Sequence, residues 1–238
     1  MAPDTTPAAL LARMVAADPG RPRVTVYDDT DGPARGERVE LSARVVANWV
    51  AKAANLLQDE LDVGPGDTVR LDLPPHWRTL YWAFAVWSVG ACVVVGEDPA
   101  GDPAAVVTDA PGGDAPGRLV VVTLAALARS APEPVPAGAV DEARELATHG
   151  DVFVPWEDPD PAAAGLRTDG AEVALGELVP GASGPAERVH TSTTDTGAFL
   201  RTALAAWAGD GSVVLTRGTP DPQVLRQRLA SEGVTATA

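Results

Sequence analysis

The sequence predicts an α/β protein with largely parallel sheets and helices on both of their faces. Short continuous runs rich in valine, at residues 92–95, 106–108 and 119–123, are typical of parallel strands covered on both sides. Longer segments with apolar residues at three- and four-residue spacing indicate amphipathic helices. The last part of the chain alternates strand, helix, strand, helix, strand, which is the pattern of parallel βαβ units.

The N-terminal elements are a helix, a strand pair and a longer helix. Residues 8–17 are apolar but too short for a signal-peptide core or a membrane span, so we expect an opening helix. Residues 24–27 predict a strand that enters a polar turn, with residues 39–41 as its hairpin partner. Residues 45–61 predict a helix with one buried face, and Ser42 stands where its N-terminal cap is expected.

The middle of the chain predicts a buried helix followed by a long connection. A Gly-Pro-Gly-Asp turn at residues 64–67 precedes a half-buried strand at residues 69–73. Residues 77–89 are apolar nearly all round, which predicts an interior helix. Residues 130–169 are rich in Pro, Ala, Gly and acidic residues, and we expect a connection in which only residues 152–156 pack.

The C-terminal elements complete a predicted division into two lobes. Asp221 and Gly233 are the expected boundary signals of the last helix. We expect an N-terminal α/β lobe at residues 1–129, the connection at 130–169 and a second βαβαβ lobe at 170–238, or one compact domain overall. The elements expected in the second lobe are strands at 188–191, 212–216 and 234–237 and helices at 197–208 and 222–232.

Composition excludes several classes of partner. The chain has 18 Lys and Arg against 33 Asp and Glu, and this net charge of -15 repels nucleic acids and anionic membrane surfaces. We therefore expect neither as a partner. The single cysteine, Cys92, excludes an intrachain disulfide and a cysteine metal cluster, and a reducing cytoplasm is the expected location.

Few residues suggest catalysis. His76, His149 and His190 are scattered without metal-binding spacing, so we expect no metal, and the absence of a glycine-rich nucleotide motif predicts no cofactor. Lys52, the only lysine, lies in the helix at residues 45–61. A buried lysine could act as a base, but we expect its stem to pack while its ammonium reaches water. No catalytic residue is identified.

The segment that most suggests ligand binding is the run of hydroxyl-bearing residues at 191–197, between a predicted strand and a predicted helix. Hydroxyls and amides at a helix N-terminus can bind an anion or a phosphate. The preferred alternative is that Thr194, Asp195 or Thr196 only caps the helix. The candidate ligand-binding residues are Arg188, His190, Thr193, Thr194, Asp195, Thr196, Gly197 and Arg201.

The order of these predicted elements resembles that in the N-terminal part of the adenylate-forming superfamily, which includes acyl-CoA synthetases, luciferases and nonribosomal adenylation domains. The resemblance rests on the helix at 41–61, the GPGD turn, the VRLDL strand, and the buried helix that ends before CVVV. It is closest over residues 21–96 and resumes near residue 189, with GDGSVVL at 209–215. The chain is most similar to a short actinobacterial family related to AMP-binding enzymes.

The resemblance implies a fold without the family's chemistry. The superfamily holds ATP phosphates with a Ser-, Thr- and Gly-rich loop ending in Pro-Lys-Gly, whereas residues 157–173 are rich in Pro and Ala in the corresponding interval. The later adenine and ribose motifs and the C-terminal domain with its catalytic lysine are absent from the sequence. An adenylate also requires a cation clamp on the phosphates, and no arginine cluster replaces the missing lysines.

Three hypotheses follow. The preferred one is a noncatalytic interaction or regulatory module, truncated relative to the family, whose exposed sheet edge or apolar face is covered by a second copy or by an adenylating-enzyme-like partner. The alternative is a small-molecule binding protein or enzyme that keeps a nucleotide or acyl pocket near residues 191–197. The third is a fragment of a longer enzyme, against which Met1 argues.

Overall fold

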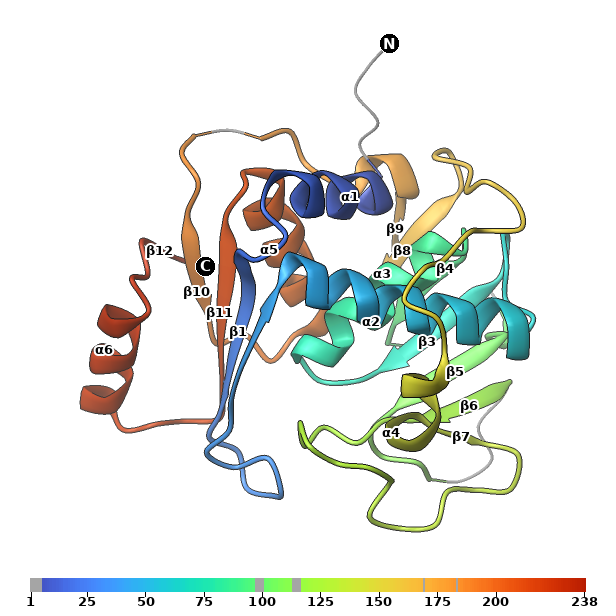
Figure 1. Ribbon diagram of the computed structural model, residues 1–238, viewed down its shortest axis with the longest axis horizontal. Coiled ribbons are helices and arrows are strands. Elements are labelled where there is room, and N and C mark those ends of the chain that lie inside the picture. Colours follow the sequence, from blue (N-terminus) through green and yellow to red (C-terminus); the bar gives the residue numbers. More distant parts are fainter. Residues whose placement is uncertain (1–5, 97–100, 113–116, 169, 183) are drawn as a thin grey trace.

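Two β-sheets organise the molecule (Figure 1). The computed structural model describes residues 6–96, 101–112, 117–168, 170–182 and 184–238. Sheet A has the strand order β12-β10-β11-β1-β2, and sheet B has the order β7-β6-β5-β3-β4-β8-β9. Neighbouring strands are parallel, except that β1 with β2 and β8 with β9 are antiparallel. The predicted fold class, α/β with largely parallel sheets, is confirmed.

Sheet A joins the two ends of the chain. The central strand β1 pairs in parallel with β11, and β2 returns beside β1 as the predicted hairpin partner. The first predicted lobe therefore contributes two strands to the sheet of the second lobe, although the division into lobes stays a prediction. Two of its boundary residues, 1 and 169, lie outside the described residues. The strands are β1 (Pro22–Asp28), β2 (Arg38–Ser42), β10 (Arg188–Thr191), β11 (Ser212–Arg217) and β12 (Ala236–Thr237).

Sheet B contains the valine-rich runs. The strands β4 and β5 flank β3, and their valines are buried except for the half-buried Val95, as expected for parallel strands covered on both sides. The strands are β3 (Thr68–Asp72), β4 (Cys92–Val95), β5 (Ala105–Thr108), β6 (Arg118–Val121), β7 (Val140–Asp141), β8 (Ala164–Thr168) and β9 (Ala171–Ala174).

Three helices begin at caps that the sequence predicts. Ser42, Asp195 and Asp221 each accept a hydrogen bond from a backbone N–H in the first turn of the helix that follows. A π-helical turn, Leu56–Glu60, continues α2. The helices are α1 (Pro7–Ala17), α2 (Ala43–Asn55), α3 (Trp77–Ser88), α4 (Glu142–Glu145), α5 (Thr196–Ala208) and α6 (Pro222–Ser231).

The core lies around α3, which contacts strands of both sheets. Every residue of α3 from Trp77 to Trp87 is buried, which confirms the predicted interior helix. Two of the buried indoles are hydrogen-bonded: Trp87 donates to the Gly165 carbonyl at 2.6 Å, and Trp207 donates to the Arg23 carbonyl at 2.9 Å. The indole N–H groups of Trp77 and Trp82 have no hydrogen-bond partner among the described residues. Buried indole N–H groups with partners stabilise the junction between the sheets.

The prediction for residues 130–169 is wrong in two respects. First, this segment contains β7, α4 and β8, and its Leu146 and Leu166 belong to the core. Secondly, of the residues expected to pack at 152–156, Phe153 lies against the core, but Val152, Val154 and Trp156 are on the surface, 78%, 71% and 71% exposed.

The exposed stretch is held in place by polar side chains of α2 and its π-helical turn. Asn55 donates to the carbonyls of Gly150 and Val152, at 3.1 and 3.0 Å. Gln58 accepts from the Trp156 N–H at 2.9 Å, so the apolar side chains alternate outward along an extended backbone. The Lys52 side chain of α2 binds the residues that directly precede this stretch, because its ammonium donates to the carbonyls of residues 147 and 149.

Candidate functional site

The predicted ligand residues on β10 face the side of sheet A that α6 covers. Arg188 donates to Thr25 Oγ1 at 2.9 Å and to Ser212 Oγ at 3.1 Å, and it pairs with Glu232 at 2.5 Å. His190 Nε2 lies 3.1 Å from Thr216 Oγ1, and burial lowers the pKa of this imidazole. Both side chains are therefore engaged within the protein.

The hydroxyl-rich loop before α5 is also internally bonded. Asp195 accepts from the Ala198 N–H at 2.7 Å and caps α5, as the preferred alternative predicted. Thr193 Oγ1 accepts from the Asp195 N–H at 3.1 Å, and Thr196 Oγ1 donates to the Leu73 carbonyl at 2.7 Å, whereas Thr194 is exposed. The local bonds of this loop thus explain its composition without a ligand.

Gly197 and Arg201 lie further along α5. A Cβ atom on Gly197 would come within 2.9 Å of Thr168 Cγ2, so glycine allows α5 to approach β8 closely. Arg201 lines a shallow groove of about 440 Å³ together with Val189 and Ala238. The structure therefore distributes the predicted residues over the α6 side of sheet A, the loop before α5 and this groove, and a ligand-binding role for them stays a prediction.

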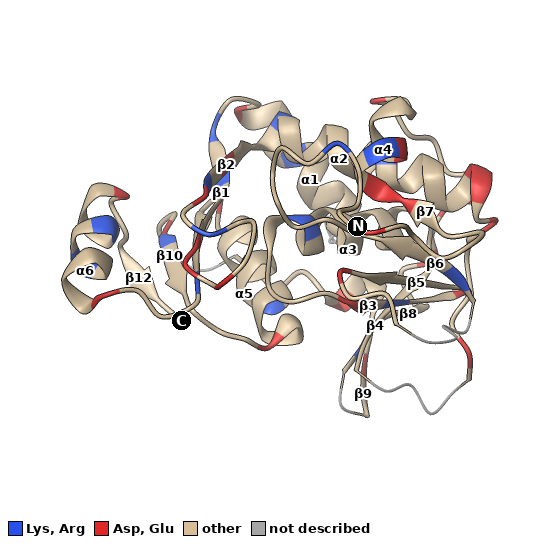
Figure 2. Cartoon of the chain, turned by 90° about the horizontal axis from the view of Figure 1, so that it is seen from below, with Lys and Arg blue, Asp and Glu red and all other residues tan. Residues whose placement is uncertain are grey.

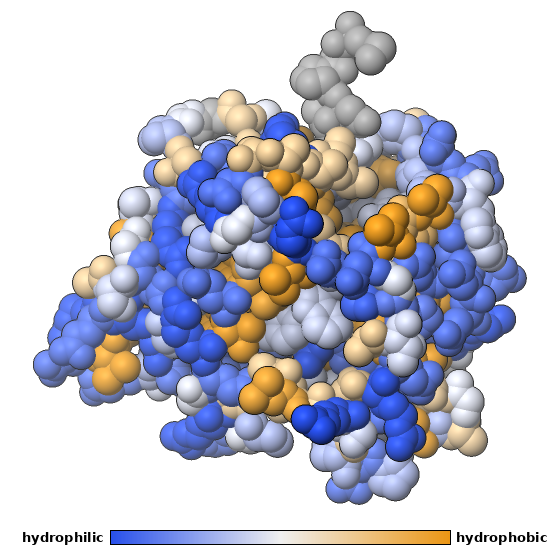
Figure 3. All heavy atoms as spheres, in the orientation of Figure 1, coloured by the Kyte–Doolittle hydropathy of each residue, from blue (hydrophilic) through white to orange (hydrophobic). Residues whose placement is uncertain are grey.

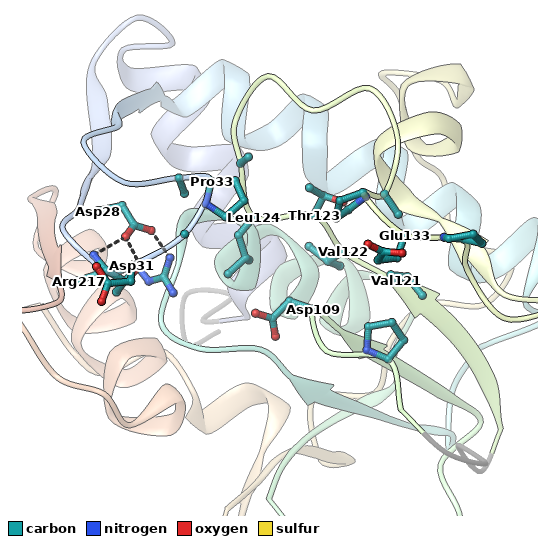
Figure 4. A pocket seen from close by; sticks show the side chains of 18 of the residues that line it. Asp28, Asp31, Pro33, Asp109, Val121, Val122, Thr123, Leu124, Glu133 and Arg217 are labelled. Carbon is teal, nitrogen blue, oxygen red and sulfur yellow. Dashed lines mark hydrogen bonds and ion pairs between the residues drawn. The ribbon is translucent and has the colours of Figure 1, made fainter.

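A larger cavity, of about 640 Å³, lies where strands of both sheets end (Figure 4). Sheet A contributes Asp28 at the end of β1 and Arg217 at the end of β11. Sheet B contributes Asp109, directly after β5, and the segment 121–125 after β6. Ligands of α/β folds bind outside the carboxyl ends of parallel strands, and this cavity has that position.

Close backbone contact brings the two sheet A residues together. Gly218 follows Arg217 with a φ of +80°, and a Cβ atom on it would lie 2.6 Å from the Asp29 carbonyl carbon. Arg217 forms an ion pair with Asp28, and the Asp28 carboxylate also accepts from the Thr30 N–H at 2.9 Å. The charges of this pair cancel at the wall of the cavity.

Two carboxylates of the lining remain without such a partner in the described part of the chain, those of Asp109 and Glu133. Burial raises the pKa of Asp109, although its own backbone N–H and the charge of Arg217 act in the opposite direction. Glu133 is exposed at one side of the rim, and Asp31, at the opposite side beside Arg217, pairs with Arg35 at 2.5 Å (Figure 4). The cavity is therefore acidic overall.

The rest of the lining is mostly apolar. Val121 and Val122 are buried, and Leu124 and Pro111 complete this wall. The Thr123 hydroxyl is buried and has no hydrogen-bond partner among the described residues. An apolar wall with a few polar groups is the usual composition of a small-molecule site.

Buried polar contacts hold the wall of the cavity in position. Arg78 donates to the Ala125 carbonyl at 3.2 Å and to Glu142 Oε1 at 2.8 Å, and both side chains are buried. The carboxylate of Asp141 accepts from the Ala131 N–H at 3.0 Å. The short elements β7 and α4 therefore anchor the two loops that enclose the cavity.

Sequence reasoning did not identify this cavity. Asp28 falls in the polar turn expected after residues 24–27, and Asp109, Thr123 and Arg217 are not among the candidate residues. The available signal was that each of these polar residues stands within two positions of the end of a parallel strand or at its last residue. Within the described residues, no group of three His, Cys, Asp or Glu side chains is arranged to hold a metal ion, and no helix is long and apolar enough to span a bilayer.

Comparison with known proteins gives a family and a fold. No protein-family model matches the sequence. A TIGR03089 family protein of Mycobacterium tuberculosis is 37% identical over 250 residues, covering 98% of each chain.

Several solved structures are similar to this chain in fold. An acyl-CoA synthetase from Brucella canis superposes with a TM-score of 0.72 at 16% identity, over 96% of this chain and 46% of its own. The N-terminal subdomain of NpsA from Klebsiella oxytoca gives 0.64 at 13% identity, over 98% and 60%. The amide bond synthetase McbA from Marinactinospora thermotolerans gives 0.65 at 16% identity, over 95% and 47%. The chain thus spans less than two thirds of each of these structures. It belongs to the TIGR03089 family and has the fold of the N-terminal part of adenylate-forming enzymes.

Proposed function

We propose that the protein is a noncatalytic binding module that holds a small molecule in the cavity between its two sheets. The cavity itself carries the proposal. Its volume of about 640 Å³ lies inside the range of about 300–1,000 Å³ that is usual for ligand pockets. Its position at the carboxyl ends of β1, β5, β6 and β11 is also that of ligand sites in α/β folds.

The charges of the cavity argue against adenylate formation there. Phosphoryl chemistry depends on cationic groups that neutralise the charge developing on the phosphates. In the described lining, Arg217 is the one cationic side chain, and its charge is balanced by Asp28. Lys52, the only lysine of the chain, is occupied at residues 147–151. These observations support binding without catalysis.

A cavity-filling substitution tests the proposal. Leu124→Trp places a large ring in the cavity, whereas Leu127→Trp changes a residue of the same loop that is 91% exposed and outside the lining. We expect members of a small-molecule panel to raise the melting temperature of the wild-type protein and of Leu127→Trp, but not that of Leu124→Trp. Saturation at a hundred times Kd stabilises a protein by about 2.7 kcal/mol, which is several degrees for a chain of this size.

The comparison of the two tryptophan variants is decisive. If the same compounds stabilise Leu124→Trp as strongly as the wild type, the ligand lies elsewhere and the proposal fails. If both variants lose the effect equally, the loop as a whole is disturbed, and Thr123→Val then tests the same cavity with a smaller change.

A second candidate function is self-association through the ridge formed by Val152, Val154 and Trp156. These three side chains are more than two thirds exposed on a stretch whose backbone is hydrogen-bonded to Asn55 and Gln58. Apolar atoms emerge among hydrophilic ones at the upper right of Figure 3, where the segment after α4 crosses α2 in Figure 1. A preordered apolar ridge loses little conformational entropy when it binds. We propose a second copy of the chain as its partner.

Sedimentation velocity tests this candidate. The adjacent Glu157 and Asp158 are exposed and would repel their counterparts in a second copy, so association should strengthen with added salt. We expect Trp156→Ser to abolish the dimer, whereas the control Leu127→Ser, at an exposed leucine outside the ridge, leaves it unchanged. A wild-type chain that stays monomeric at high salt and high concentration would contradict self-association.

A further inference from the structure

We infer that the cavity between the sheets selects small organic cations, with a protonated amine facing Asp109 and a compact apolar body against Val122 and Leu124. This inference rests on the proposed function, because it names the class of ligand for the same cavity. It goes beyond the fold, since the fold alone does not determine the charge of a ligand.

The first argument is the balance of charge. Asp28 and Arg217 neutralise one another, and Asp31 is paired with Arg35 at the rim. Asp109 and Glu133 remain, so the lining carries two negative charges that no described cation balances. The net charge of -15 on the whole chain has the same sign and draws cations toward the molecule from a distance.

The second argument is the placement of Asp109. Its carboxylate points into the space between the Asp28–Arg217 pair and the segment 121–124 (Figure 4). An ionised carboxylate can only accept hydrogen bonds, so a ligand beside it must supply donors. An ammonium group supplies three donors and a positive charge. It would also remove the cost of desolvation that raises the pKa of Asp109.

The third argument is the remaining surface of the cavity. Val121, Val122 and Leu124 offer an apolar wall that can bury the hydrocarbon part of an amine. The cavity therefore offers a carboxylate to the ammonium group of the ligand and an apolar wall to its hydrocarbon part.

The same features disfavour anions. A ligand carboxylate or phosphate in this cavity would face Asp109 and Glu133, while Arg217 is already bonded to Asp28. Like charges in a partly desolvated site repel strongly. Nucleotides and free acids should therefore bind more weakly than amines of the same shape.

Matched probes of different charge test the inference. Each set shares one hydrocarbon body, and an example is 2-phenylethylamine, 2-phenylethanol and 3-phenylpropionate. Aliphatic and indole bodies form further sets, and calorimetric titration measures the affinities. We expect the amine to bind most tightly in the sets that bind, and Asp109→Asn to weaken amine binding about ten- to a hundredfold while alcohol binding changes little.

Asp31→Asn is the matched control. It removes the same charge from the same lining, but at an exposed, ion-paired carboxylate, so we expect less than a twofold change in amine affinity. If Asp31→Asn weakens amines as much as Asp109→Asn, the effect is one of net charge and the inference is overturned.

The outcomes separate the inference from the proposed function. Carboxylates or alcohols that bind as tightly as amines, with binding lost in Leu124→Trp, would overturn the selection of cations and leave the binding module intact. If no probe of any set binds, the proposed function fails together with the inference.

Discussion

His76 is the residue whose burial has the clearest energetic consequence. It is 2% exposed, and its Nδ1 accepts a hydrogen bond from the Arg78 N–H at 3.3 Å, which caps α3. Burial lowers the pKa of His76 well below its usual value, and the charges of Arg217 and Arg78 lower it further. The folded protein therefore holds His76 neutral at pH values where the unfolded chain takes up a proton.

This difference predicts a loss of stability in mild acid. Because the folded pKa is depressed, the contribution of His76 is complete above the unfolded pKa of about 6.5 and declines as the pH falls, by up to about 1.4 kcal/mol per pH unit. His76→Asn keeps a capping acceptor and removes the titrating group. We expect its free energy of unfolding, measured in urea between pH 7.5 and 5.5, to depend less on pH than that of the wild type.

A second buried histidine, His190, does not affect the comparison between the wild type and His76→Asn. Its pKa is also lowered by burial, so it adds to the pH dependence of both proteins and cancels in the comparison. Equal slopes in the wild type and His76→Asn would contradict the assignment of the acid sensitivity to His76.

Local residue patterns predicted the helix caps well. Asp195 and Asp221 cap α5 and α6, because a cap requires only a suitable side chain next to its own helix. The exposed position of Val152, Val154 and Trp156 could not be predicted in this way. It depends on Asn55 and Gln58, which lie more than 90 residues earlier in the chain.

At the scale of elements, α6 is attached to the rest of the molecule almost without apolar contact. It has no buried residue, and charged residues of both signs lie on α6, β1 and β2 (Figure 2). Arg228 binds Asp29 through two hydrogen bonds of 2.6 and 3.2 Å and lies 4.0 Å from the ring centroid of Tyr27. Glu232, just after the helix, pairs with Arg38 at 2.8 Å.

These contacts predict that α6 can be loosened selectively. Burial would raise the pKa of Glu232, but hydrogen bonds from Arg38, Tyr27 and Arg188 lower it to about 2. The depressed folded pKa means that this stabilisation is present above the unfolded value of about 4.3 and is lost as the pH falls toward 2. At pH 7 we expect Glu232→Gln to speed amide hydrogen exchange in α6 by about tenfold, corresponding to roughly 1.4 kcal/mol.

Two controls belong to this prediction. Glu172→Gln makes the same charge change at the exposed pair with Arg167 on sheet B and should leave the exchange of α6 unchanged. Salt at about 0.5 M should act on the wild type in the same direction as Glu232→Gln, because it screens the ion pairs. Uniform acceleration over α5 and α6 would show instead that the whole of sheet A had been destabilised.

At the scale of the whole molecule, the sequence predicted which elements form but not how they combine. Periodicity and valine-rich runs are local signals, and they identified β3, β4, β5 and α3. The pairing of β1 with β11 has no local signal, and the polar residues at the strand ends do not show by themselves that they meet at one cavity. Asp28, Asp109, Thr123 and Arg217 meet only after two sheets have formed and approached one another. The predicted site near residue 191 followed a sequence run and therefore missed this convergence.

The position of β1 also determines the order in which the molecule can be completed during synthesis. β1 and its parallel neighbour β11 are about 190 residues apart in the chain. At about 5–20 residues per second, β1 is synthesised about 10–40 seconds before β11. During that interval Val24 and Val26 lack their final neighbours, and β2, which follows within 10 residues of β1, is the native strand already present. The hairpin of β1 with β2 therefore covers one edge of β1, whereas the edge that later pairs with β11 stays open to other chains until β11 emerges.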